Sequence, residues 1–253
     1  MRSWVSLFKK EIRSMLFTIL VSVLLVSAWE IYLITRMDVW PLGLTFGLGF
    51  IPFAIFPLIM LVMGYQSFRQ EWKNNTIYLL KSLPRKGYEI VSAKLASSSL
   101  VYIVLTLYTF GLHMFFHWDQ FQMLMGQVPE QVANTFSTRM VVLSIVTYIL
   151  FGIVPYLLSQ FSYLVSCFYS KFRWLVSIVV FGLSHYLLVR LGGFVARLFN
   201  WLPDIPIDVM WSSPYGEEMA TIYLGSGPVI AGLLLLAGFF FTGSWILEKQ
   251  LDV

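Results

Sequence analysis

The sequence predicts an all-α integral membrane protein with six transmembrane helices, and its composition and apolar patterning carry this prediction. Of the 253 residues, 58% are hydrophobic and only 12% are charged, about half the charged share of a typical soluble domain. The mean hydropathy is +0.76. So few charges exclude both a soluble globular domain and a disordered chain. The apolar residues form unbroken runs instead of the alternation typical of a membrane barrel, which favours helices.

Each of the six apolar runs is about as long as a bilayer crossing requires. Six spans of about 20 residues take up roughly half of the chain, so no room remains for a separate soluble enzyme domain. We therefore expect a single transmembrane domain over residues 1–253. The predicted spans cover residues 14–34, 42–65, 95–116, 140–168, 174–190 and 228–247.

The distribution of basic residues predicts the orientation of these spans. Thirteen of the 17 Lys and Arg fall on the side that holds both termini, and an excess of basic residues marks the cytoplasmic side. Both termini are thus expected in the cytoplasm. The tripeptide Val26–Ala28 resembles a signal-peptide cleavage site. The apolar run nevertheless continues to Ile34, so we expect the first span to be retained.

Residues 1–13 have the periodicity of an amphipathic helix lying in the cytoplasmic interface before the first span. Glu11 is the exception, because it projects from the middle of the apolar face. Its carboxylate either snorkels to water or pairs with a basic group from elsewhere in the protein. The sequence leaves both interpretations open.

The longest cytoplasmic segment, residues 66–94, contains a short predicted helix. Thr76 can cap a helix over residues 77–83 that Pro84 would end. Ile77, Leu80 and Leu83 would form one apolar stripe on it. A basic loop attracted to anionic lipid is the simpler interpretation, but it does not explain the stripe, which needs a partner to cover it.

The outer segment, residues 191–227, is too long for a tight turn and too apolar for a free loop. Pro203, Pro206 and Pro214 forbid one long helix. Backbone at membrane depth must be buried in protein or line a cavity. We therefore expect short helices that dip into the outer leaflet, forming a re-entrant gate before the last span.

No catalytic motif is present. The sequence has neither a P-loop nor an H-E-x-x-H motif, its basic residues form no stripe suited to nucleic acid, and Cys167 has no partner at metal-ligand spacing. His113 and His117, four residues apart, could hold a metal, but the end of a polar helix is the favoured interpretation, so no metal site is predicted.

Polar residues inside predicted spans are candidates for a translocation path. Glu30 lies near the outer end of the first span, where it could also snorkel outward or pair with Arg36. The fourth span carries the others, downstream of Pro155: Tyr156, Ser159 and Gln160.

Nearly the whole arrangement resembles a permease subunit of the type-2 ABC exporter family. Such permeases have an amphipathic first helix with a Lys-Lys-Glu-like motif, then a cytoplasmic E-x₃-G-T-x₂-L-L-x-S-L-P pattern followed by E-I-x₃-K. Asn75 stands where the pattern has Gly, and Ser213-Pro214 stands where the family often has Asn-Pro. The matching residues are Lys9, Lys10, Glu11, Glu71, Thr76, Leu79, Leu80, Ser82, Leu83, Pro84, Glu89, Ile90 and Lys94.

The resemblance implies a multi-pass protein of the plasma membrane, most simply a bacterial one. It would work with a second permease, a copy or a paralogue, and with a separate ATPase subunit that binds ATP and Mg²⁺. The chain itself would hold no cofactor and would not be an enzyme. The residues that would couple it to the ATPase are Glu11, Thr76, Ile77, Leu80, Lys81, Leu83, Arg85 and Lys86.

The apolar, aromatic-rich spans suit an amphipathic cargo, such as a peptide antibiotic, a drug or a lipid. Two other classes stay open at this point. One is an intramembrane lipid-modifying enzyme, which would need a nucleophile or a metal cluster that the sequence does not display. The other is the substrate-capturing membrane subunit of a vitamin importer, which would leave the pattern in residues 66–94 unexplained.

Overall fold

The computed structural model of the chain describes residues 2–78, 86–127, 138–169, 171–213 and 216–250. Within these ranges, six helices are long and apolar enough to cross a membrane, which confirms the predicted fold class and span number. The elements in chain order are α1 (Arg2–Ile34), α2 (Leu42–Leu48), α3 (Ile51–Lys73), α5 (Gly87–Gln127), α7 (Thr138–Ser166), α8 (Arg173–Arg197), β1 (Ile205–Ser213), β2 (Gly216–Leu224), α9 (Ser226–Trp245) and a final π-helical turn (Ile246–Gln250).

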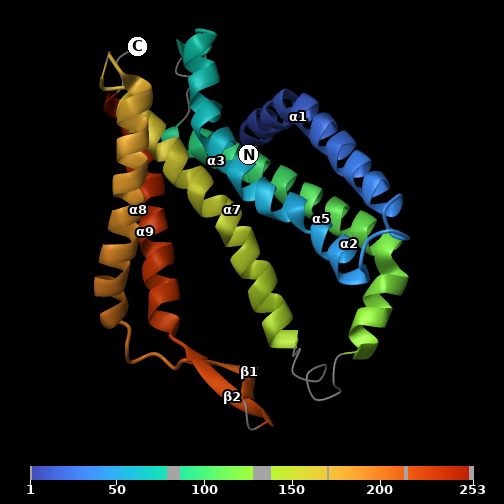
Figure 1. Cartoon of the computed structure of the whole chain (residues 1–253). Helices are drawn as coiled ribbons and strands as arrows, with labels where there is room; N and C mark the ends of the chain where they lie inside the picture. Colours follow the sequence, from blue (N-terminus) through green and yellow to red (C-terminus); the bar gives the residue numbers. More distant parts are fainter. Residues whose placement is uncertain (1, 79–85, 128–137, 170, 214–215, 251–253) are drawn as a thin grey trace.

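The helices pack in two groups joined by α7. Helix α1 packs along α5, helix α8 packs along α9, and α7 contacts α3, α8 and α9. Figure 1 shows α1 and α5 on the right, α8 and α9 on the left, and α7 between them. Gly64 permits the close approach of α3 to α7, because a Cβ at this position would meet the backbone carbonyl of Tyr156.

Helix α1 contains both the predicted amphipathic segment and the first span. It is helical without a break from Arg2 to Ile34, and Figure 1 shows its first part lying at a sharp angle to the rest. The position of this first part in the membrane interface stays a prediction. Leu7 is buried in a core shared with α3, α5, α7 and the final turn, and the indole of Trp4 donates a hydrogen bond to the Ser92 hydroxyl at 3.1 Å. The start of α1 is therefore held against α5.

The predicted second span is divided into α2 and α3 around Gly49 and Phe50. Pro52 lies in the first turn of α3, where its missing N–H would have had no helical acceptor. Helix α5 has its own irregularity at His117, whose φ of −113° and ψ of 20° are not helical. Both irregularities lie near the end of the bundle where α2 contacts α5.

The outer segment contradicts the predicted short helices. After α8, strands β1 and β2 form an antiparallel hairpin in which Ile205 pairs with Leu224 and Ser213 with Gly216. Pro203 and Pro206 oppose a helix, whereas the β-branched residues of both strands favour an extended backbone. Pro206 is tolerated because a two-stranded sheet consists of edge strands. The role of this hairpin as a gate stays a prediction.

We name the two ends of the bundle for use below. The basic end holds the start of α1, the end of α3, the start of α5 and the final turn; Leu7, Phe68, Ile77, Ile90 and Leu247 share one core there. The hairpin end holds α2 and the β-hairpin (Figure 1). The distribution of Lys and Arg predicts that the basic end lies in the cytoplasm.

Candidate functional site

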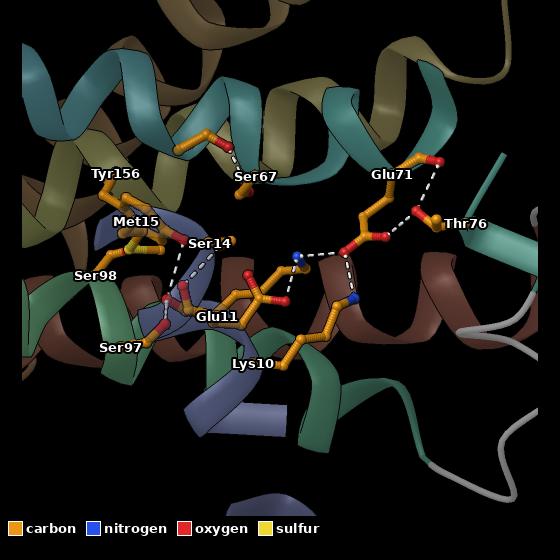
Figure 2. Close-up of polar contacts among 12 residues, drawn as sticks. Lys10, Glu11, Ser14, Met15, Ser67, Glu71, Thr76, Ser97, Ser98 and Tyr156 are labelled. Carbon is orange, nitrogen blue, oxygen red and sulfur yellow. Dashed lines mark hydrogen bonds and ion pairs between the residues drawn. The ribbon is translucent and has the colours of Figure 1, made fainter. Parts of the chain in front are cut away.

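Lys94 lies at the centre of a buried ion-pair network at the basic end. Its Nζ is 2.9 Å from Glu11 Oε1 and 3.1 Å from Glu71 Oε1. The exposed fractions of these side chains are only 2% for Lys94, 8% for Glu11 and 9% for Glu71. The network therefore ties α1, α3 and α5 together at one point, as Figure 2 shows for Glu11 and Glu71.

A second lysine completes this network. Lys10 Nζ also lies 3.1 Å from Glu71 Oε1, but its side chain is 53% exposed. The set of Lys10, Glu11, Glu71 and Lys94, which we call the charge network, holds two positive and two negative groups. Burial of charge is tolerated when opposite charges lie in contact, and here the charges balance. Pairing of Glu11 with a basic group from elsewhere is confirmed, and its partner is Lys94.

The turn after α3 is fixed to the charge network. The Thr76 hydroxyl donates to the Glu71 carboxylate (Figure 2), and the Thr76 N–H donates to the Glu71 carbonyl at 2.9 Å. Asn75 adopts a left-handed backbone with a φ of 55°, a conformation that Gly and Asn tolerate best. The Asn at this position of the pattern thus meets the same backbone requirement that Gly would. Thr76 ties the turn to α3 through Glu71.

The prediction that Ile77 belongs to an apolar stripe for a partner protein is wrong. This side chain is 1% exposed and packs in the core of the basic end, so the chain itself already covers it. Its neighbour Tyr78 is 54% exposed. Lys86 is exposed and lies over the ring of Tyr88. The other predicted coupling residues lie outside the described residues: Leu80, Lys81, Leu83 and Arg85.

Of the predicted path residues, Tyr156 joins the basic end. Its hydroxyl donates to the backbone carbonyl of Lys94 at 3.1 Å. Gln160, one turn further along α7, is 1% exposed, and neither atom of its amide has a hydrogen-bond partner among the described residues. Glu30 lies 19 residues beyond Glu11 on α1, about 28 Å along the helix axis. The structure therefore does not gather the predicted path residues into one site.

Ser159 lines a groove between α3, α7 and α8. This cavity of about 370 Å³ is mostly apolar and reaches Tyr65, Arg69 and Trp174. A second cavity of about 410 Å³ shares these three residues and adds Lys73 and Arg173. An apolar groove thus leads to a basic, aromatic mouth at the basic end.

Glu30 forms a second buried polar site with His113 and His117. All three side chains are fully buried. Glu30 Oε1 lies 3.2 Å from His113 Nδ1, and Glu30 Oε2 lies 3.2 Å from His117 Nε2. Neither alternative for Glu30, snorkelling outward or pairing with Arg36, agrees with this geometry. The interpretation of the two histidines as a polar helix end is also wrong, because both are buried and α5 continues to Gln127. We call Glu30, His113 and His117 the outer cluster.

Most of the chain matches the model of a known protein family. Residues 8–170 match the family model described as ABC-2 family transporter protein. The chain belongs to this family. No curated protein and no solved structure matches it. Since the match covers more than half of the chain, the protein is an ABC-2 type permease, a multi-pass membrane subunit of an ABC transporter.

The permease's charge network could be anticipated only in part from the sequence. Glu11, Glu71 and Lys94 all stand in the pattern that the family resemblance uses, yet Lys94 was not selected as a site residue. The outer cluster was missed as a unit. Its available signals were the spacing of four between His113 and His117 and the position of Glu30 inside a span.

Proposed function

We propose that this permease is the membrane-spanning subunit of an ATP-driven exporter and couples to a separate ATPase subunit at the basic end. The observation that carries the proposal is the bridge from Lys94 to Glu11 and Glu71. The turn that leads into the predicted coupling segment is bonded to Glu71. A push on that turn would therefore reach α1, α3 and α5 together.

The contact surface for the ATPase begins at Tyr78 and Lys86, which are exposed on either side of residues 79–85. The remaining part of the surface is the sequence-based assignment of Leu80, Lys81, Leu83 and Arg85. Apolar side chains would supply the anchor and basic ones the rim, the usual division in protein interfaces. ATP and Mg²⁺ would bind to the ATPase, because this sequence has no P-loop.

The cargo best suited to the permease is amphipathic. The groove between α3, α7 and α8 offers an apolar wall, and Arg69, Lys73 and Arg173 surround its mouth. A molecule with an apolar body and an anionic or polar end would find both surfaces in one continuous space. A second permease, identical or related, would complete the path, and transport would run from the cytoplasmic side outward.

Copurification with the ATPase tests this assignment. Tyr78→Ala should weaken the complex about tenfold or more, because a buried aromatic anchor typically contributes about 2 kcal/mol. Tyr223→Ala is the matched control, since Tyr223 is 67% exposed on the hairpin at the other end. Cargo-stimulated ATP hydrolysis should fall in parallel for Tyr78→Ala alone. Equal copurification and hydrolysis in the two variants would refute the coupling surface.

A further inference from the structure

The outer cluster buries a carboxyl group against two imidazole rings. Glu30 is a carboxylate from α1 with 0% exposure, and its ion-pair partners among the described residues are the two histidines of α5. A buried carboxylate without a full positive partner is strongly unfavourable. A cation bound among these three side chains would supply that positive partner.

Gln120 contacts one ring nitrogen of His117. Its Oε1 lies 3.1 Å from His117 Nδ1 and also accepts a hydrogen bond from the Thr45 hydroxyl at 3.3 Å. With the Gln120 amide in this orientation, Nδ1 of His117 is the donor. In the neutral ring, Nε2 then presents a lone pair.

That lone pair is directed at another acceptor. His117 Nε2 is 3.2 Å from Glu30 Oε2, yet it has no hydrogen-bond partner among the described residues. Two electron-rich atoms at this distance repel each other unless a cation lies beside them. His113 contributes a nitrogen to the same place, because its Nδ1 lies 3.2 and 3.3 Å from the two Glu30 oxygens.

The spacing of these atoms suits a tetrahedral metal ion. One ligand atom from each of Glu30, His113 and His117 lies within 4.8 Å of the other two. Ligands at about 2.0–2.1 Å from a tetrahedral zinc ion are about 3.3 Å apart, close to the 3.2 Å separations between Glu30 and each histidine. Two imidazoles and one carboxylate are a common zinc ligand set that leaves the fourth position open.

The surroundings hold the ligands in place, as metal sites require. Gln120 fixes the orientation of His117 by accepting its Nδ1 proton. The rings of Phe46 and Phe50 lie 5.0 and 5.2 Å from that of His113. Gly49 packs directly on the His113 ring, where a Cβ would overlap the imidazole. The cluster is therefore rigid, buried and shielded by apolar groups.

We propose that Glu30, His113 and His117 bind a divalent transition metal ion, best fitted by Zn²⁺, which fastens α1 to α5 near the hairpin end. In the metal-bound site the neutral His113 ring carries its one proton on Nε2, so that Nδ1 presents its lone pair to the metal, and a water or an anion fills the fourth position. This site is independent of the proposed ATPase contact, since Glu30 lies about 28 Å along α1 from Glu11 of the charge network.

Zinc titration of the full-length permease tests this proposal. The protein, purified without a polyhistidine tag and stripped with a chelator, is titrated with Zn²⁺ against a chromophoric competitor. Wild type should bind about one ion per chain and gain thermal stability. Glu30→Gln, which keeps size and hydrogen-bonding capacity, and His117→Ala should each weaken binding at least about tenfold. Gln120→Leu, which removes the orienting acceptor, should weaken it ten- to a hundredfold.

His185→Ala is the matched control, because His185 is exposed on α8 and lies outside the cluster. It should bind zinc like wild type. Should His117→Ala fail to fold, Glu30→Gln and Gln120→Leu still decide the question. Absence of zinc binding by wild type, or unchanged binding by Glu30→Gln, would overturn the proposal. The cluster would then be an ion pair between Glu30 and a protonated histidine.

Discussion

The charge network and the outer cluster are both buried polar sites between α1 and α5, but they solve the problem of buried charge differently. In the charge network, two lysines face two carboxylates, and each ionised group contacts an opposite charge. In the outer cluster, one carboxylate faces two imidazoles, and two ring nitrogens have no hydrogen-bond partner among the described residues.

This difference indicates what each site needs. In the charge network, each charged group has an opposite charge from the same chain. The free energy of unfolding of the permease therefore depends on every partner. The outer cluster brings one ligand atom from each of its three side chains within 4.8 Å of the others, and the proposed metal ion would complete it. A loss of one partner should therefore destabilise the permease at the basic end, whereas a loss at the hairpin end should mainly change metal binding.

The largest effect is expected from Lys94→Met. This substitution leaves Glu11 and Glu71 buried without their shared cation, and loss of one partner from a buried pair typically costs about 3–5 kcal/mol. Thermal unfolding in detergent should reveal a large fall in Tm. Lys10→Met is a close control, since Lys10 contacts the same Glu71 oxygen at the same 3.1 Å but is 53% exposed. An exposed pair contributes about 1 kcal/mol or less, and equal losses in the two variants would contradict the network.

A smaller effect is expected from Gly49→Ala at the outer cluster. The added methyl group would overlap the His113 imidazole, and overpacking of this kind typically costs about 1–3 kcal/mol. Zinc affinity should fall together with Tm. Gly43→Ala is the control, because a Cβ on Gly43 meets nothing within 4 Å. A Gly49→Ala protein with unchanged Tm and zinc affinity would show that His113 is not held in this position.

The smallest effect is expected from Thr76→Val. The hydroxyl's bonds to Glu71 are lost while the shape of the side chain is nearly kept, and a hydrogen bond to a charged group contributes about 1.5–3 kcal/mol at most. Because Lys94 and Lys10 still hold Glu71, we expect a loss of about 1 kcal/mol. The transport rate should fall clearly although Tm changes little, since the turn into the coupling segment is no longer bonded to the charge network. If the Thr76→Val variant has a normal Tm and a normal transport rate, Thr76 has no role in coupling.

Features encoded locally were predictable from the sequence. The spans follow from unbroken apolar runs of bilayer length, and the predicted end of the first span at Ile34 agrees with the end of α1. The left-handed turn at Asn75 follows from residue type and motif position. The pairing of Glu11 was anticipated because a carboxylate on an apolar helix face requires a partner or water.

Features that depend on distant contacts were not predictable in this way. Glu30 and His113 are separated by 83 residues, so no local periodicity joins them, and each alone suggested a different role. Ile77 looked available to a partner because its stripe was judged without the core that α1, α3, α5, α7 and the final turn provide. The β-hairpin was not predicted, because the prolines exclude one long helix but do not indicate that two strands pair.

Photo-crosslinking at position 78 tests the proposed coupling most directly. A photoreactive residue replaces Tyr78 in one protein and Tyr223 in the other, and native membranes containing the assembled transporter are irradiated. Both side chains are exposed, at 54% and 67%. Position 78 follows the end of α3 at the basic end, whereas position 223 lies in β2, which Figure 1 shows at the hairpin end. We expect an adduct that contains a P-loop ATPase from position 78 and none from position 223. An ATPase adduct from position 223, or none from position 78, would contradict the account.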